Sequence, residues 1–414
     1  MHILDDLKFR GLLNQCNDFD ILYQELKTKC ILYCGFDVTA DSLHIGNLLP
    51  LVCLKRFQKL GHSPIILVGD STSLVGDPSG KKLERKLNSE ETVNEWSKKI
   101  KKQIKLFFGD SDYKLVSNQS WSNKLNFFDF IRDIGKHFPI GYMLAKESVH
   151  SRLESGISFT EFSYMLIQAY DFFILNKKYD CRLQIGGSDQ WGNITAGIDL
   201  IRKKRQKKAF GLTIPLVLKS DGSKFGKTES GTIWLDPKKT SPYKFYQFWI
   251  NTSDQDIMQF LKYFTFLSAK EIITLEEKVK NNPNEREAQH ILASKMTEMI
   301  HGEDVLKKVK KITNALFGNG VRSLSINEIE DAFDSIPSYT IDNQNKVQLV
   351  DILVHADISP SKRQAHEDIR NKSIHINGVI CLDVGKYLTS KDRLFNQYTI
   401  IRRGKKKYFL IKWK

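Results

Sequence analysis

Residues 31–49, with the sequence ILYCGFDVTADSLHIGNLL, constrain the fold more than any other stretch of the chain. Residues 31–33 form an apolar run of side chains that favour strands. Gly35 and Asp37 are expected to end that strand, because both residue types favour turns. We therefore interpret the stretch as a buried strand, a loop and the first turns of a helix.

The expected helix runs over residues 46–60 and begins among polar residues. Asp41 and Ser42 offer turn and capping oxygens, and Gly46 leaves room for a ligand to approach the backbone. His44 and Asn47 are three residues apart, so both project from one face of the first turn. A helix N-terminus that follows a strand is a natural phosphate site. The alternative is that His44 is only a cap or a surface group.

Strand-like and helical stretches alternate along the first half of the chain. The expected strands are 31–36, 64–69, 113–116, 181–186 and 213–218, and the expected helices are 46–60, 90–107, 125–134, 158–176 and 188–204. This alternation predicts an α/β fold with a parallel sheet and covering helices.

The chain changes character after Pro237, where a helical pattern replaces the alternation. We predict four segments, which are a sheet domain at 1–238, an α-helical domain at 239–320, a polar linker at 321–345 and a small α+β domain at 346–414. A chain of 414 residues is too long for a single core, which agrees with several domains.

The net charge is +15, with 63 Lys and Arg against 48 Asp and Glu. This excess favours a polyanionic partner such as nucleic acid, although genome bias can also enrich lysine. The six cysteines show no C-x-x-C pair, so we expect neither a zinc site nor a disulfide framework. Scattered thiols suit a reducing cytoplasm. We expect no membrane span and no leader peptide, because long apolar runs are missing.

A glycine-rich loop, GDSTSLVGDPSGKK, covers residues 69–82. Its spacing fails the phosphate-loop pattern, because only three residues separate Gly76 from Gly80 and no Ser or Thr follows Lys81. We interpret it as a loop after a strand with Asp77 at its centre. The basic residues that follow belong either to a phosphate site or to a solvated helix face; they are Lys81, Lys82, Arg85 and Lys86.

The expected helix 158–176 carries Tyr164, Gln168 and Asp171 on one stripe of an otherwise apolar and aromatic segment. Polar side chains on a core-facing stripe are costly unless they are hydrogen-bonded. They therefore pair with one another or line a pocket, and a solvated outer face is the alternative.

Two further segments carry polar groups next to glycines. Gly186 and Gly187 end an expected strand and allow close backbone approach, and Asp189 and Gln190 follow them at the mouth of the sheet, where an acid suits ribose hydroxyls. Residues 224–228, KFGKT, form a cationic loop that in isolation is no more than a surface turn.

Four of these segments, in this order, resemble the motifs of the bacterial tyrosyl-tRNA synthetases, which are class I aminoacyl-tRNA synthetases. Residues 44–47 resemble the class I His-Ile-Gly-His signature, with Asn47 in place of the last histidine. Residues 224–228 resemble the KMSKS signature, and 164–171 and 186–193 resemble the tyrosine-pocket segments. The resemblance implies a Rossmann-like catalytic domain, an anticodon-side helical domain and a C-terminal RNA-binding domain.

The resemblance also implies roles in binding L-tyrosine. Tyr33 and Asp171 would bond the phenol hydroxyl. The ammonium group would be held by Asp77, Tyr164 and Gln168, and the carboxylate by Gln190.

The implied ATP-binding residues are Cys34, Gly35, Asp37, His44, Gly46, Asn47, Asp189 and Lys227. Cys34 and Asp189 would contact the ribose, and His44 and Asn47 would contact the phosphates or the ribose. The groups acting on the departing pyrophosphate would be Thr39, Lys81, Arg85, Lys224, Lys227 and Thr228. ATP would be a substrate accompanied by Mg²⁺.

The C-terminal domain resembles a small RNA-binding fold shared with a ribosomal protein of the small subunit, and Lys362, Arg363 and Arg370 would face RNA phosphates. The family implies tRNA(Tyr) as a partner, a symmetric homodimer and a cytoplasmic location. The apolar run 127–131 belongs either to a core or to an interface.

Three alternatives stay open at this point: a class I relative for another amino acid such as tryptophan, an RNA-binding paralogue without catalysis, and a small-molecule adenylyltransferase. Tyr33 and Asp171 argue against tryptophan, because an indole has no hydroxyl.

Overall fold

The computed structural model describes residues 2–414 except 80–86, 154–155, 221, 223–224, 229–230, 318–319, 334–335, 343–345 and 405–406. The chain divides into two compact units, one of residues 1–236 with 252–292 and one of residues 237–251 with 293–414. Residues 252–292 therefore group with the sheet, although they belong to the segment we predicted as a separate helical domain. The predicted domain boundaries stay a prediction.

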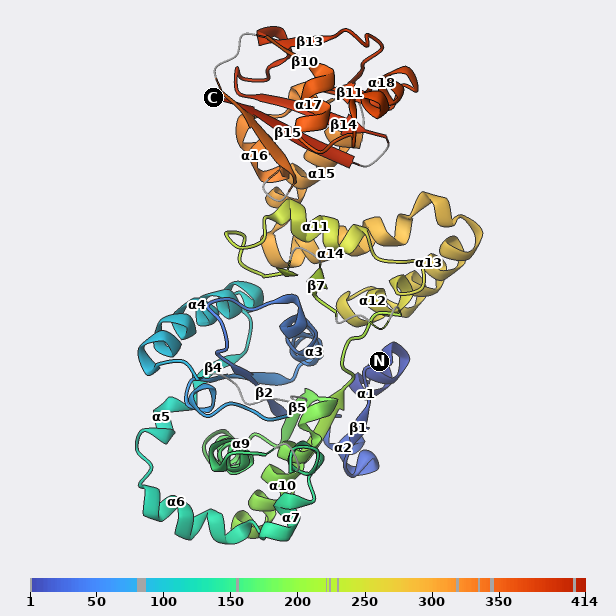
Figure 1. The fold of residues 1–414 in the computed structure, drawn as a ribbon. Coiled ribbons are helices and arrows are strands. Elements are labelled where there is room, and N and C mark those ends of the chain that lie inside the picture. The colour runs from blue at the N-terminus through green and yellow to red at the C-terminus, as the bar shows by residue number, and fades with distance from the viewer. Residues whose placement is uncertain are drawn as a thin grey trace. The chain divides into compact units, whose positions relative to one another are not determined.

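A parallel sheet forms the centre of the first unit (Figure 1). Its described strands lie in the order β1-β6-β5-β2-β3-β4. Their bounds are β1 (Gln15–Cys16), β2 (Ile31–Asp37), β3 (Ser63–Gly69), β4 (Lys114–Ser117), β5 (Leu183–Gly187) and β6 (Phe210–Ile214). Strands β2 to β6 pair in parallel, and β1 is an antiparallel edge strand. The predicted α/β fold class is confirmed.

Helices cover both faces of this sheet. Helices α3 (Leu48–Lys59) and α4 (Glu90–Phe108) lie on one face, and α9 (Phe159–Tyr179) and α10 (Trp191–Arg205) lie on the other (Figure 1). The rings of Tyr33 from β2 and Phe172 from α9 pack 5.1 Å apart within the core. The shorter helices of this unit are α1 (Ile3–Arg10), α2 (Phe19–Glu25), α5 (Gln119–Ser122), α6 (Phe127–Asp133), α7 (Ile140–Leu144) and α8 (Glu147–His150).

Two predicted elements have different bounds in the structure. The strand expected at 213–218 is β6, at Phe210–Ile214. It ends there because the next residue, Pro215, has no N–H for a ladder hydrogen bond. The helix expected from residue 46 opens with a 3₁₀ turn at Ile45–Asn47 before α3.

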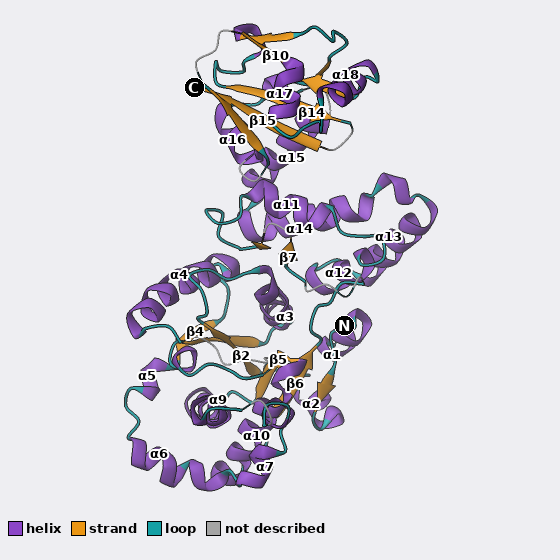
Figure 2. Ribbon diagram, in the orientation of Figure 1, coloured by secondary structure: helices purple, strands orange, loops and turns teal. Residues whose placement is uncertain are grey.

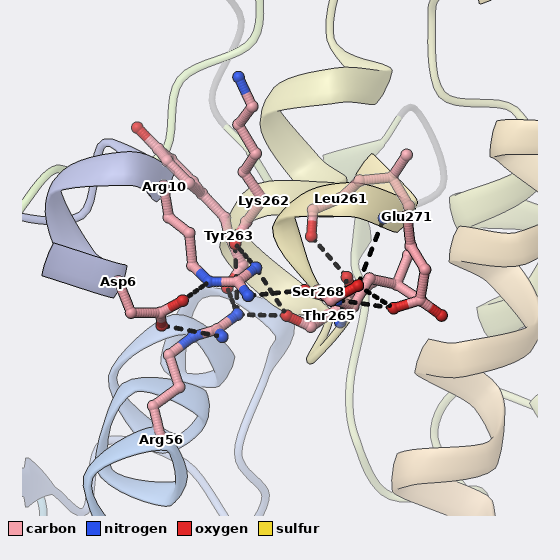
Figure 3. A network of polar contacts seen from close by, with 10 residues as sticks. Asp6, Arg10, Arg56, Leu261, Lys262, Tyr263, Thr265, Ser268 and Glu271 are labelled. Atoms are coloured by element: carbon pink, nitrogen blue, oxygen red, sulfur yellow. Dashed lines mark hydrogen bonds and ion pairs between the residues drawn. The ribbon is translucent and has the colours of Figure 1, made fainter. Parts of the chain in front are cut away.

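A buried ion network explains why α12 (Ile257–Phe264) belongs to the first unit (Figure 3). Arg10 of α1 and Arg56 of α3 are each 4% exposed, and both pair with Asp6, at 2.8 and 3.5 Å. Both guanidinium groups also donate to the carbonyls of Lys262 and Thr265 at the C-terminal end of α12. These carbonyls carry the negative end of the helix dipole, so the network joins three helices. Helix α13 (Ala269–Asn281) follows.

Helices dominate the segment from residue 242 to 317, as the pattern predicted (Figure 2). They are α11 (Pro242–Ile250), α12, α13, α14 (Glu287–His301) and α15 (Glu303–Phe317). Within the described ranges, no helix is both long and apolar enough to cross a lipid bilayer.

The second unit ends in a small α+β fold, as predicted. Its sheet has the order β12-β11-β14-β15-β9. The elements are α16 (Ile326–Phe333), β9 (Ser338–Ile341), β10 (Lys346–Gln348), α17 (Leu349–His355), α18 (Lys362–Arg370), β11 (Ile374–Ile376), β12 (Val379–Ile380), β13 (Tyr387–Thr389), β14 (Tyr398–Arg403) and β15 (Lys407–Trp413). Helices α17 and α18 contribute to one apolar core with the sheet.

The expectation of an irregular linker at 321–345 was wrong for two stretches. Helix α16 buries Ile329 and Phe333, and β9 pairs in parallel with β15. The partner strand lies about 70 residues further along the chain. Local sequence pattern carries no signal for such a pairing, because the hydrogen-bond partner is distant.

Candidate active site

Several predicted site residues that the structure describes lie in β2 and β5 or just after β2, β3 and β5, among them Tyr33, Asp77 and Gln190. In the sheet, β2 has β3 as its neighbour on one side and β5 on the other. The chain continues from β2 to β3, so the strand order reverses between β2 and β5, and this is the topological switch point of the sheet. Ligands of open α/β sheets bind at the carboxyl ends of strands at such a point. The site is therefore where the topology of the sheet favours ligand binding.

A buried acid and a buried hydroxyl define one end of the site. Asp171 of α9 is 1% exposed and accepts hydrogen bonds from Asn118 Nδ2 at 3.0 Å and Trp121 Nε1 at 2.7 Å. Burial raises the pKa of Asp171 to about 7, although these two donors favour the ionised form. Among the described residues, the hydroxyl of Tyr33 has no hydrogen-bond partner.

The Tyr33 hydroxyl also lies in the field of Asp171. Burial raises the pKa of Tyr33 well above its usual value, and the charge of Asp171 raises it further. A buried hydroxyl without a protein partner is costly. Together, Tyr33 and Asp171 can bond a polar group of a ligand that would otherwise be unpaired in an apolar pocket.

A second cluster of polar groups lies on the same stripe of α9. The Tyr164 hydroxyl donates to Asp37 Oδ2 at 2.9 Å, and Gln168 Oε1 accepts from Asn193 Nδ2 at 3.2 Å. Gln190 Nε2 donates to Asp77 Oδ2 at 2.7 Å. Tyr164 and Asp171 are buried, so the alternative of a solvated outer face is wrong for these two residues.

This cluster combines carboxylates with neutral acceptors, which suits a ligand ammonium group. Burial raises the pKa of Tyr164 well above its usual value, and the charges of Asp37 and Asp77 raise it further. Tyr164 therefore remains a neutral hydroxyl at neutral pH.

The glycine-rich loop borders a small cavity. Asp37 and Thr39 line a cavity of about 220 Å³, together with Ser73 and Gly76 of the loop. Asp77 is buried, and its Oδ1 accepts from the backbone N–H of Ser79 at 2.9 Å. The basic residues predicted beside this loop, Lys81, Lys82, Arg85 and Lys86, lie outside the described residues.

His44 caps the 3₁₀ turn that opens α3. Its Nδ1 accepts from the backbone N–H of Gly46 at 3.0 Å, and Asn47 Oδ1 accepts from the backbone N–H of His44 at 3.0 Å. The neutral imidazole therefore carries its proton on Nε2. The predicted capping role of Asp41 and Ser42 was wrong, because Ser42 donates to the carbonyl of Leu43 and Asp41 pairs with a lysine.

Gly46 is required by this arrangement. A Cβ at position 46 would lie 2.8 Å from Cε1 of His44, closer than Cβ atoms approach other atoms. The interpretation of His44 as a cap is confirmed, and it is compatible with a role in ligand binding through Nε2.

The segment containing the second signature packs directly on the first. Gly226 has φ +81°, and a Cβ there would lie 2.3 Å from Ile45 Cγ2. The N–H of Ile233 donates to the carbonyl of Gly226 at 3.1 Å, and the N–H of Ile45 donates to the carbonyl of Ile233 at 2.9 Å. Strands β7 (Lys227–Thr228) and β8 (Gly231–Thr232) form a hairpin between these contacts.

This packing brings the two signatures together through the backbone. Lys224 lies outside the described residues, as do the side chains of Lys227 and Thr228, so their predicted roles stay predictions.

The residues predicted near the ribose differ in exposure. Cys34 is 4% exposed, and its Sγ donates to the carbonyl of Gly35. Burial raises the pKa of the Cys34 thiol. Gly35 itself is exposed within β2, which continues to Asp37, so the expectation that Gly35 ends the strand was wrong. A Cβ at Gly187 would lie 2.5 Å from Asp189 Oδ1, so this glycine makes room for a side chain of the protein itself.

Four polar residues of the site were not singled out from the sequence. Asn118 and Trp121 contact Asp171, Thr72 contacts Asp37, and Asn193 contacts Gln168 and Gln190. Asn118 follows β4 directly, so its position after a strand was a usable signal. Trp121 could not be distinguished from an ordinary core residue by its sequence position.

The predicted RNA-binding residues lie together on α18 of the second unit. Lys362, Arg363 and Arg370 are exposed, and Lys362 Nζ pairs with Asp351 at 2.7 Å. In the first unit, Phe127 and Phe128 of α6 are 66% and 75% exposed, so these two residues are not part of a core.

A Rossmann-type sheet, a capped His-Ile-Gly-Asn turn and a second lysine-containing signature packed against it define a class I aminoacyl-tRNA synthetase. A family model described as tRNA synthetases class I (W and Y) matches residues 24–318, and one described as a tyrosine–tRNA ligase C-terminal domain matches 328–411. The chain belongs to the tyrosine–tRNA ligase family.

Curated relatives match the chain from end to end. The tyrosine–tRNA ligase of Bacillus caldotenax is 56% identical over 419 residues, covering 100% of both chains. Tyrosine–tRNA ligase 1 of Bacillus subtilis strain 168 is 53% identical with the same coverage. Among solved structures, a C-terminally truncated mitochondrial tyrosyl-tRNA synthetase of Aspergillus nidulans is 32% identical with a TM-score of 0.69, covering 76% of this chain and 94% of that one.

Proposed function

We propose that this site joins L-tyrosine to ATP as tyrosyl-adenylate, with release of pyrophosphate, and then transfers the tyrosyl group to the 3′-terminal ribose of tRNA(Tyr), with release of AMP. The observation that carries the proposal is the buried pair of Tyr33 and Asp171, which suits a phenol hydroxyl. The full-length similarity to tyrosine–tRNA ligases supports the same activity.

In the first step, a carboxylate oxygen of tyrosine attacks the α-phosphorus of ATP. The bond between that phosphorus and the bridging oxygen breaks, and pyrophosphate leaves with the bond electrons. The carboxylate is already ionised at neutral pH, so no general base is required. The protein contributes orientation and stabilises the negative charge that develops on the phosphates.

The residues take the following parts in this step. Tyr33 and Asp171 bond the phenol hydroxyl. Asp77, Tyr164 and Gln168 hold the ammonium group, and Gln190 holds the carboxylate. His44 Nε2–H faces the phosphates at a helix N-terminus, where the dipole favours anions, and Gly46 has no side chain that would block their approach.

The lysines of the second signature neutralise the departing pyrophosphate, and the Thr39 hydroxyl donates a hydrogen bond to it. Magnesium arrives as part of the ATP substrate, bound through the phosphates. In the described part of the chain, no group of three or more His, Cys, Asp or Glu side chains could hold a metal ion.

The test is ATP–pyrophosphate exchange with L-tyrosine, L-phenylalanine and L-tryptophan supplied separately. Exchange with tyrosine alone is the expected result. Exchange with tryptophan would overturn Tyr33 and Asp171 as the selecting groups, and no exchange with any of the three would favour the RNA-binding paralogue.

We assign RNA binding to the exposed basic face of α18. Each arginine that contacts a phosphate contributes one released counterion, so Arg363→Ala and Arg370→Ala should each raise the KM for tRNA and reduce the salt dependence of binding by about one unit of slope. ATP–pyrophosphate exchange should be unchanged. A deletion of 346–414 is a less clean test, because it removes β15, the partner of β9.

We assign a homodimer interface to five of the exposed apolar side chains of the first unit, chosen around the run 127–131. They are Phe127, Phe128, Ile131, Ile140 and Phe159, which are between 44% and 75% exposed. Exposed apolar side chains that gather into a patch mark protein–protein contacts. Phe128→Asp should convert a dimer to a monomer in sedimentation experiments, whereas a dimer that survives this substitution would refute the assignment. A cytoplasmic location agrees with the six free cysteine thiols.

A further inference from the structure

An unbroken chain of buried and partly buried hydrogen bonds connects the two ends of the site. Asn118 Nδ2 donates to Asp171 Oδ2 at 3.0 Å and to Thr72 Oγ1 at 3.2 Å. The Thr72 hydroxyl donates to Asp37 Oδ1 at 2.7 Å, and Asp37 Oδ2 accepts from the Tyr164 hydroxyl at 2.9 Å. Within this chain of bonds, Thr72 contacts Asn118 and Asp37 but not Asp171, and it has no part in substrate binding under the proposed function.

The direction of each bond in this chain is determined by the chemistry of the groups. Asn118 is fully buried, and its Oδ1 accepts from the backbone N–H of Ser71 at 2.8 Å, which places its amide nitrogen towards Thr72 and Asp171. The Thr72 oxygen receives a hydrogen from Asn118, so its own hydrogen goes to Asp37, because an ionised carboxylate only accepts. The arrangement therefore has one orientation for the Thr72 hydroxyl.

The backbone leaves space for this contact at one particular residue. Gly69 ends β3 beside the Asp37–Thr72 bond, and a Cβ there would lie 2.3 Å from Asp37 Oδ1 and 2.3 Å from Thr72 Oγ1. An alanine at position 69 would displace both side chains. The close contact between Asp37 and Thr72 thus depends on a glycine in a strand, where glycine otherwise weakens the sheet.

Burial makes the Thr72 bond difficult to replace. Thr72 is 3% exposed and Tyr164 is 5% exposed, so water has little access to either hydroxyl. Without the Thr72 hydroxyl, the charged carboxylate of Asp37 would lose one of its hydrogen-bond donors at Oδ1. A hydrogen bond to a charged group contributes more than one between neutral groups.

We propose that Thr72 is a positioning residue that orients Asp37, and through it the Tyr164 hydroxyl, towards the ammonium group of the amino-acid substrate. The same hydroxyl joins this end of the site to Asn118 and Asp171 at the phenol end. The proposal rests on the assignment of Tyr164 to the ammonium group under the proposed function. Thr72 contacts no substrate atom in this role.

The test compares two ligands that differ only in the ammonium group. The full-length protein is titrated with L-tyrosine and with 3-(4-hydroxyphenyl)propanoate, which keeps the phenol and the carboxylate. Thr72→Val should weaken L-tyrosine binding about tenfold and change binding of the propanoate less than twofold. Thr72→Ser, which keeps the hydroxyl, should bind both ligands as the parent does.

Gly69→Ala should reproduce the Thr72→Val result, because it separates the same two side chains from the opposite side. The matched control is Thr213→Val. Thr213 is fully buried in β6, and its hydroxyl donates to Asn14 Oδ1 at 3.2 Å. This control removes a comparable buried hydroxyl away from the site and should leave the ratio of the two dissociation constants unchanged.

The outcomes separate this proposal from the one on which it rests. An equal loss of affinity for both ligands in Thr72→Val would mean general damage to the pocket and would overturn the proposal, as would no loss for either. Tyr164→Phe is measured in parallel. An unchanged ratio of the two dissociation constants in Tyr164→Phe would refute the ammonium assignment itself, whereas an unchanged ratio in Thr72→Val alone would refute only the positioning role.

Discussion

Removing the hydroxyl of Tyr33 should lower amino-acid selectivity without lowering the stability of the protein. In Tyr33→Phe the ring stays in place, packed against Phe172 at 5.1 Å. The lost hydroxyl is buried and has no partner among the described residues, so no hydrogen bond within that part of the protein is broken. Most substitutions of buried polar residues break such a bond, which makes this change unusually clean.

The expected magnitude follows from the bond that the substrate makes. A neutral hydrogen bond contributes about 0.5–1.5 kcal/mol, so the kcat/KM ratio of tyrosine to phenylalanine should fall roughly 2- to 13-fold. Phenylalanine makes no bond to Tyr33, so its own kcat/KM should be unchanged or higher. The free energy of unfolding of the free protein should not fall, because folding no longer removes this hydroxyl from water.

ATP–pyrophosphate exchange with each amino acid gives the two kcat/KM values, and urea unfolding of the free protein gives the stability. Tyr179→Phe is the matched control, because Tyr179 is a half-buried tyrosine at the C-terminal end of α9. It should leave the ratio unchanged. A ratio that does not change in Tyr33→Phe, or an unfolding free energy that falls by more than about 1 kcal/mol, would refute the reasoning.

Three further predictions concern titration, the buried ion network and the capped turn. Burial raises the pKa of Asp171 from 3.8 to about 7, so the unliganded protein should lose stability as the pH rises from about 4 to 7, and Asp171→Asn should abolish that slope in urea unfolding. Asp6→Ala leaves two buried arginines without their carboxylate and should lower the unfolding free energy by about 3–5 kcal/mol, again measured with urea. Gly46→Ala should push the His44 ring away and reduce the kcat of pyrophosphate exchange at least tenfold, whereas the affinity for tyrosine measured by equilibrium dialysis should stay the same.

The residues of the proposed tyrosine site differ in how far they could be predicted. Tyr164, Gln168 and Asp171 were recognisable from the sequence, because polar residues at helical spacing on an apolar helix stand out against their neighbours. Asn118 and Trp121 were not recognisable, because they come from a different part of the chain. Their relation to Asp171 exists only once β4 is paired with β3 in the sheet.

The glycines and the capping residues show a similar division. The sequence suggested that Gly46, Gly186 and Gly187 leave room for a ligand, and the structure shows that Gly187 leaves room for a side chain of the protein itself. Gly69, which was not singled out, does the same for Asp37 and Thr72. His44 could be assigned as a cap or as a ligand-binding group from its position. The structure shows the cap, which also determines which ring nitrogen carries the proton.

The sequence by itself determined the alternation of strands and helices, the strand at 31–36 followed by a helix N-terminus, the two signatures and the family. These features depend on the order and spacing of residues that are close together in the sequence. Local periodicity therefore predicts them. Tertiary structure alone decided that residues 252–292 join the first unit, that β9 completes a sheet with β15, and that Thr72 lies between Asn118 and Asp37. These contacts join residues far apart in the chain, and their free energy depends on burial and hydrogen-bond geometry that exist only after folding.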